Sequence, residues 1–179
     1  MSEFWRQEEW VYRGVFLGLA LASLFLRLLP LGGEPGALPG PDLMLCLIMA
    51  WIIRRPDFLP MPLILMVILV EDLVLMRPPG LWTAIMVLAT EFLRGRTILT
   101  RELSFPVEWA LVSGLMVGML LAYRLILGLA LVPQPAFGFA AVQILWSIGC
   151  YPIIVGASRL VIDLRKPATG EIDDYGRRL

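Results

Sequence analysis

Long apolar runs separated by short polar segments dominate this sequence. Six such runs cover residues 10–31, 41–54, 58–76, 80–94, 107–132 and 137–162. A helix needs roughly 20 apolar residues to cross a bilayer, and the first, fifth and sixth runs exceed that length. The pattern therefore predicts an all-α fold, a polytopic membrane helix bundle of six transmembrane helices. The second and fourth runs are shorter, so they must be sheltered by longer neighbours or lie where the bilayer thins, or else form a re-entrant hairpin.

The segments between the runs are typical of tight helix connections. Residues 32–41 are rich in Gly and Pro, and proline also occurs in the segments 54–57, 77–80 and 133–135. The tail after Asp163 is polar and has no apolar face. We therefore expect one six-helix transmembrane domain over residues 1–163 and a short cytoplasmic tail over residues 164–179.

Composition excludes two broad classes of protein. Of the 179 residues, 59% are apolar and 17% are charged, against about 25% charged residues in ordinary soluble domains. A soluble domain of this size could not bury so much apolar surface, which argues against a soluble enzyme. The 15 basic residues balance the 15 acidic ones, so the chain lacks the positive charge that binds nucleic acid.

Basic residues set the expected orientation, because short cytoplasmic loops of membrane proteins are enriched in Arg and Lys. With the N-terminus inside, only Arg27 and Arg77 fall at the outer face. The cytoplasmic segments collect Arg6, Arg54, Arg55, Arg94, Arg96, Arg101, Arg165, Lys166, Arg177 and Arg178. The sequence therefore predicts a multi-pass inner-membrane protein with both termini in the cytoplasm.

Residue types that carry catalysis are scarce. The chain has no histidine, and its two cysteines, Cys46 and Cys150, each lie inside an apolar run. We expect both cysteines to be small buried hydrophobes. The sequence also has no phosphate-binding glycine loop, no paired-histidine zinc motif and no nucleophile elbow. We therefore expect a protein that is not an enzyme and holds no cofactor or metal.

Charged residues within the expected spans are the first candidate site. Glu71 and Asp72 lie in the third run and Arg124 lies in the fifth, and a rise of about 1.5 Å per residue places them at similar depth. We expect Arg124 to pair with one of the two acids. Such a cluster suits a proton or ion relay or a polar substrate site, or else a structural ion pair that fixes helix register. The lack of histidine favours the structural interpretation.

A second group of charges borders the cytoplasmic loop between the fourth and fifth runs. Glu91 precedes Arg94 by one helical turn, which predicts an ion pair at the membrane interface. Glu102 and Glu108 are expected to be solvated or to contact a partner. The basic residues of this loop, Arg94, Arg96 and Arg101, are candidates for contacts with a partner protein.

Small residues recur at a spacing of four on two of the runs. They are Gly14, Gly18 and Ala22 on the first, and Gly114, Gly118 and Ala122 on the fifth. This spacing allows helices to approach closely. It predicts either packing within this chain or a docking face for another membrane protein. Aromatic residues such as Trp51 and Trp82 lie near predicted span ends, as in the aromatic belts of membrane proteins.

Residues from Pro41 to Trp109 form a series with a specific order and spacing. It contains Pro41-Asp42-Leu43, Trp51, Arg55-Pro56, Asp72, Pro78, Gly80, Glu91-Phe92-Leu93, an Arg-rich loop, Phe105 and Glu108-Trp109. The order and spacing together, more than any one element, resemble the MreD family of bacterial rod shape-determining membrane proteins. The length of the chain and its six predicted spans are also similar to that family.

The resemblance implies a non-enzymatic scaffold of the bacterial cell-elongation machinery, which supports rod shape and peptidoglycan synthesis. Its implied partners are MreC, MreB, and RodA with its penicillin-binding transpeptidase, together with the lipid bilayer itself. The family is similar in fold to the substrate-binding S-components of energy-coupling-factor vitamin transporters. That similarity supplies an alternative, a small-molecule-binding subunit, which would need a polar cavity toward the outer face.

Overall fold

The computed structural model describes residues 2–29, 39–96 and 103–162, with side chains from Glu9 onward. In this part of the chain the elements are α1 (Ser2–Leu28), α2 (Leu43–Arg54), the short 3-10 helix η1 (Pro56–Phe58), α3 (Met61–Val74), α4 (Leu81–Arg94), α6 (Phe105–Leu129) and α7 (Phe137–Ile162). Each apolar run corresponds to one α-helix, so the expected all-helical fold is confirmed. Helix α1 begins before its apolar run because the preceding residues include good helix formers such as Glu, Gln and Arg.

Three of the described helices are long and apolar enough to cross a membrane. The qualifying segments are Glu9–Leu28 in α1, Phe105–Leu129 in α6 and Phe137–Val161 in α7. Large apolar side chains such as Leu21, Leu125 and Leu160 are exposed on these three helices. Many exposed large apolar side chains on long helices are typical of membrane or partner contacts.

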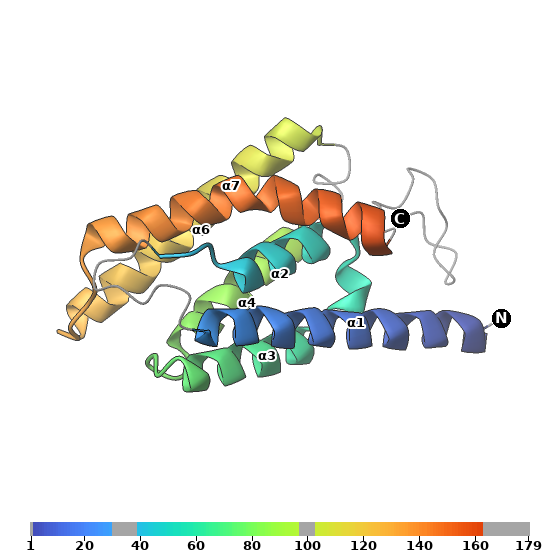
Figure 1. The fold of residues 1–179 in the computed structure, drawn as a ribbon, viewed down its shortest axis with the longest axis horizontal. Coiled ribbons are helices and arrows are strands. Elements are labelled where there is room, and N and C mark those ends of the chain that lie inside the picture. The colour runs from blue at the N-terminus through green and yellow to red at the C-terminus, as the bar shows by residue number, and fades with distance from the viewer. Residues whose placement is uncertain (1, 30–38, 97–102, 163–179) are drawn as a thin grey trace.

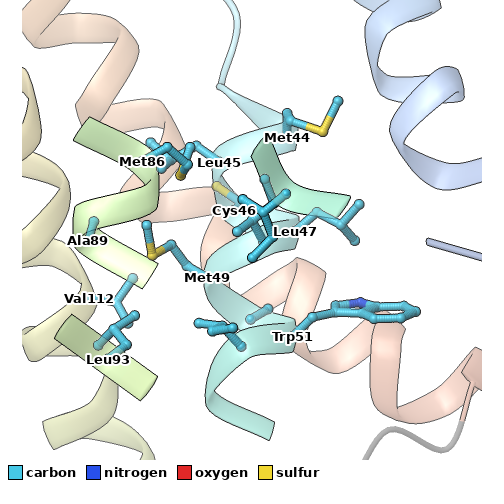
Figure 2. Packing of buried hydrophobic residues seen from close by; sticks show 14 of the residues in the cluster. Met44, Leu45, Cys46, Leu47, Met49, Trp51, Met86, Ala89, Leu93 and Val112 are labelled. Atoms are coloured by element: carbon cyan, nitrogen blue, oxygen red, sulfur yellow. The ribbon is translucent and has the colours of Figure 1, made fainter. Parts of the chain in front are cut away.

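Helix α2 is the centre of the fold. It lies between α1 and α7 (Figure 1), packs most extensively against α7, and also contacts α4 and α1. Eleven of its twelve residues are buried. A helix that is apolar on every side must be surrounded by protein or lipid, and Figure 2 shows its side chains pointing toward α4 and α6 on one side and away from them on the other. The expected sheltering of this short helix by its neighbours is therefore confirmed.

Two tryptophans expected near the membrane interface belong to this core instead. Trp51 of α2 is fully buried and packs against Phe16 of α1, with ring centroids 5.5 Å apart. Trp82 of α4 is buried and meets the ring of Tyr123 edge-on. The interpretation of these two residues as belt residues is wrong, because α2 and the start of α4 lie inside the bundle.

The helices alternate in direction, which creates two ends in the bundle. Helices α1, α3 and α6 end where α2, α4 and α7 begin, and we call this the α6–α7 hairpin end. At the opposite end, Arg94 at the end of α4 donates hydrogen bonds to the carbonyls of Pro56 and Leu59, just after α2. The start of α1 and the end of α7 both lie toward this opposite end (Figure 1).

Candidate functional site

Three charged side chains from three helices meet at the hairpin end. One guanidinium nitrogen of Arg27, near the end of α1, lies 3.0 Å from Asp42 and 2.7 Å from Glu71. Both carboxylates are almost fully buried, whereas Arg27 is partly exposed. Asp42 also caps α2, since its Oδ1 accepts the backbone N–H of Leu45 at 3.1 Å. This arrangement ties α1, α2 and α3 together through one arginine.

A second arginine extends this group of charges without direct hydrogen bonds to it. The guanidinium of Arg77, in the turn after α3, lies 3.9 Å from Asp72 and 4.0 Å from Asp42. These separations exceed hydrogen-bond range. The same guanidinium also lies over the ring of Trp82, 5.6 Å from its centroid. Arg77 is thus held by the nearby carboxylates and by an aromatic ring, and its guanidinium N–H groups make no hydrogen bond to these carboxylates.

Asp72 connects α3 to the start of α4. Its Oδ2 accepts the backbone N–H of Gly80 at 3.3 Å, the backbone N–H of Thr83 at 3.1 Å and the Thr83 hydroxyl at 2.8 Å. A carboxylate at this position satisfies N–H groups that have no partner within the helix and complements the helix dipole. Gly80 has a φ of 85°, a conformation that side chains disfavour. The spacing of Asp72, Pro78 and Gly80 therefore has a structural role as a cap and turn.

Arg124 does not join these acids, which corrects the expected pairing with Glu71 or Asp72. Its guanidinium donates to the carbonyl of Pro135 at 3.0 Å and lies over the ring of Phe137. Helix α3 packs against α4 and α1, whereas α6 packs against α4 and α7. Similar depth therefore did not make α3 and α6 neighbours: Glu71 pairs with Arg27, and Asp72 caps α4.

A cavity of about 330 Å³ opens beside this cluster. The start of α4, the end of α6, the α6–α7 connection and the start of α7 form its walls. Its polar lining residues are Asp42, Arg77, Tyr123, Arg124, Gln134 and Gln143. A wider cavity of about 690 Å³ shares Phe139 and Gln143 with it and is lined by Arg27 and Glu71. The hairpin end therefore combines buried charge with open space.

A buried ion pair lies on the α7 side of α2. Nη2 of Arg54, at the end of α2, lies 3.0 Å from Oε1 of Glu108 in the first turn of α6. The hydroxyl of Tyr151 in α7 donates to the same oxygen at 2.7 Å. Arg54 and Glu108 are essentially fully buried. The expectation that Glu108 is solvated or contacts a partner is wrong, because the start of α6 presses it against α2 and α7.

Trp109, next to Glu108, fills a gap in the backbone hydrogen bonds of α7. Its indole N–H donates to the carbonyl of Ile148 at 3.0 Å. Pro152 lies four residues further along α7 and has no N–H, so it cannot donate to this carbonyl within the helix. The Glu108-Trp109 pair thus attaches α6 to both α2 and α7.

The structure describes some of the charged residues that were expected at the membrane interface. Arg94 pairs with Glu91 at 3.1 Å, as expected from their spacing. Arg96 is exposed and lies over the ring of Phe92. Arg101 and Glu102 lie outside the described residues. The proposed role of these arginines in partner contacts stays a prediction.

The small-residue patterns lie on the outside of the bundle. Gly14, Gly18 and Ala22 are exposed along α1, and Gly114 and Gly118 are exposed on α6, where Ala122 is half-buried. A Cβ atom added to any of these four glycines would meet nothing within 4 Å. Close packing of these glycines within the described chain is therefore not found.

Comparisons with known protein families, with curated proteins and with solved structures found no match for this chain. The structure itself defines an all-helical protein, three of whose described helices are long and apolar enough to cross a membrane. Of the charged residues singled out in the sequence, Glu71, Asp72, Glu108 and Arg124 hold helix ends or helix contacts in place. Arg27, Arg54 and Tyr151 were missed as their partners, because a sequence pattern does not reveal which helices are neighbours.

Proposed function

We propose that this protein is a non-enzymatic scaffold of the bacterial cell-elongation machinery, crossing the inner membrane six times with both termini in the cytoplasm. In this proposal the protein is of the MreD type, and it associates with MreC, with MreB, and with RodA and its penicillin-binding transpeptidase. Three long apolar helices support membrane integration. The short helices α2, α3 and α4 cross beside them, where a bundle thins the bilayer locally.

The use of the polar residues supports a scaffold more than an enzyme. Asp72 caps α4, Asp42 caps α2, and Glu108 is held by Arg54 and Tyr151. Each of these three carboxylates holds a helix start or a neighbouring helix through at least one of its oxygens. These residues fix the relative positions of helices, which a docking platform requires.

The open glycine face of α1 carries the proposal. Gly14 and Gly18 lie four residues apart on an exposed helix, with no side chain of the described chain above them. In a membrane, helix association depends on close packing, and small residues at this spacing permit it. Helix α1 is therefore the surface we assign to a bitopic partner such as MreC.

The docking face can be tested without unfolding the protein. Gly14→Leu combined with Gly18→Leu should preserve insertion, because open space surrounds both positions, yet should abolish co-purification of an MreC-like protein from native membranes. Gly114→Leu with Gly118→Leu tests the face on α6 in the same way. Gly149→Leu on α7 is the matched control, since it too is exposed and unobstructed. Unchanged co-purification for both double variants would exclude these faces as docking surfaces.

Depletion in cells tests the function itself. Loss of the scaffold should turn rod-shaped cells round while uptake of vitamins continues. Normal rods after depletion, together with lost uptake of one vitamin, would contradict the scaffold and establish a transporter subunit.

One observation favours that alternative function, a substrate-binding subunit similar to the S-components of vitamin transporters. The cavity at the hairpin end has arginine, glutamine and aromatic side chains in its wall, and its volume is within the range of small-molecule sites. A vitamin that survives purification with the wild-type protein would support this alternative.

A further inference from the structure

The cavity of about 330 Å³ at the hairpin end has an uneven supply of hydrogen-bond donors and acceptors. Asp42 is its one acidic lining residue, and both of its carboxylate oxygens are engaged, Oδ1 by the N–H of Leu45 and Oδ2 by Arg27. Asp42 therefore offers little to a ligand. The remaining charged groups in the wall are the guanidinium groups of Arg77 and Arg124.

Both arginines keep capacity to bind an anion. Arg77 contacts Asp42 and Asp72 only at 3.9–4.0 Å, which is too long for a hydrogen bond. The hydrogen bond found for Arg124 uses Nη1 and goes to the neutral carbonyl of Pro135, and the described part of the chain gives it no ion pair. A planar guanidinium has five donors and matches the geometry of phosphate oxygens.

Beyond these charged groups and the polar side chains of Tyr123, Gln134 and Gln143, the wall is apolar or aromatic. It includes Trp82, Leu120, Leu127, Phe139 and Ile144. The wall therefore has a charged part, formed by the two arginines, and an apolar part. An amphipathic molecule with a charged end would satisfy both parts, whereas a free anion would leave the apolar wall uncovered.

We propose that this cavity binds the phosphate headgroup of an anionic phospholipid, with Arg77 and Arg124 as the residues that recognise the phosphate. The start of an acyl chain then lies against the apolar wall. This site is independent of the scaffold function, because it involves neither the glycine face of α1 nor the arginines that follow α4.

Lipid titration of the purified full-length protein tests the proposal. The delipidated protein in a non-ionic detergent is titrated with phosphatidylglycerol or with phosphatidylcholine of the same acyl chains, and bound lipid is counted by native mass spectrometry. We expect phosphatidylglycerol to bind about tenfold more tightly, and Arg124→Gln to lower its affinity by about tenfold, as expected for loss of a charged hydrogen bond. Equal affinity for the two lipids would overturn the proposal.

Three further variants keep the result interpretable. Arg96→Gln removes the same charge from the opposite end of α4 and should change the affinity less than about twofold, within the scatter of a surface charge. Arg77→Gln should repeat the loss seen for Arg124→Gln, and Ala140→Phe should block the cavity while both arginines remain. An equal loss for Arg96→Gln would show nonspecific attraction. Binding of inorganic phosphate with no preference for phosphatidylglycerol would assign the arginines to a free anion and overturn the lipid.

Discussion

The indole N–H of Trp109 donates a hydrogen bond to the backbone carbonyl of Ile148, the carbonyl that Pro152 leaves without its helical donor. One residue of α6 thereby supplies a hydrogen bond that the backbone of α7 lacks. A proline inside a helix normally kinks or weakens it, because a backbone hydrogen bond is lost. Here the lost donor is replaced from a neighbouring helix, so the proline and the tryptophan depend on each other.

That dependence predicts a non-additive result. Trp109→Phe leaves the Ile148 carbonyl without a donor and should cost about 1–3 kcal/mol of stability. Pro152→Ala restores the helical N–H, so Trp109→Phe should cost much less in that background. Thermal unfolding of the four proteins in detergent measures the coupling. Equal costs of Trp109→Phe in both backgrounds would show that the indole does not serve this carbonyl.

The buried pair of Arg54 and Glu108 makes the second prediction. Glu108→Leu strands a buried guanidinium and should cost about 3–5 kcal/mol, whereas Arg54→Met together with Glu108→Leu should recover most of the loss. Melting temperature and membrane yield are the measurements. Glu91→Gln is the control, because its pair with Arg94 is partly exposed and should contribute less than about 1 kcal/mol. A double variant as unstable as Glu108→Leu would contradict this account.

The helices could be predicted from the sequence because apolar runs and Pro/Gly breaks act locally. Proline lies in the first turn of α3 and α6, and Gly80 precedes α4 with a positive φ. The burial of α2 was also predictable, since a short helix without a polar side cannot face water.

The partners of the charges were not predictable in the same way. The position of a residue along a span gives its depth but says nothing about which helices touch. Glu71 therefore appeared equally suited to any arginine at its depth, and Arg27 was counted only as a basic residue at the outer face. The prediction for Trp51 failed for the same reason, because a tryptophan near a span end suits both a lipid interface and a core.

The cap that Asp72 places on α4 gives a third prediction. Asp72→Ala removes the acceptor for Gly80 and Thr83 and should destabilise the protein by about 1–2 kcal/mol or more, the usual cost of losing an N-cap. Thr83→Val removes only the hydroxyl bond and should have a smaller effect. Once Asp72 is alanine, Thr83→Val should add little to the loss in melting temperature. An undiminished effect of Thr83→Val in that background would rule out the shared cap.

The proposed orientation in the membrane predicts a labelling pattern. In a cysteine-free background, Gly36→Cys and Gln134→Cys should react with an impermeant thiol reagent added to intact cells, because both positions are assigned to the outer face. Thr97→Cys should react only after the cells are opened, since the Arg-rich segment is assigned to the cytoplasm. Labelling of Thr97→Cys in intact cells would reverse the orientation.

The last prediction separates the observed partner of Glu71 from the one that depth alone suggested. Arg27 lies 2.7 Å from Glu71, so Arg27→Leu and Glu71→Gln should be coupled by about 0.5–3 kcal/mol in a double-mutant cycle. Arg124 contacts Pro135 and Phe137 instead, so Arg124→Leu and Glu71→Gln should be additive within about 0.5 kcal/mol. Melting temperatures in one detergent supply both cycles. The sign of the coupling energy is also predicted: Glu71→Gln should partly rescue Arg27→Leu, because it neutralises the acid left without its arginine. Coupling of Arg124 to Glu71 as strong as that of Arg27 would restore the pairing expected from the sequence.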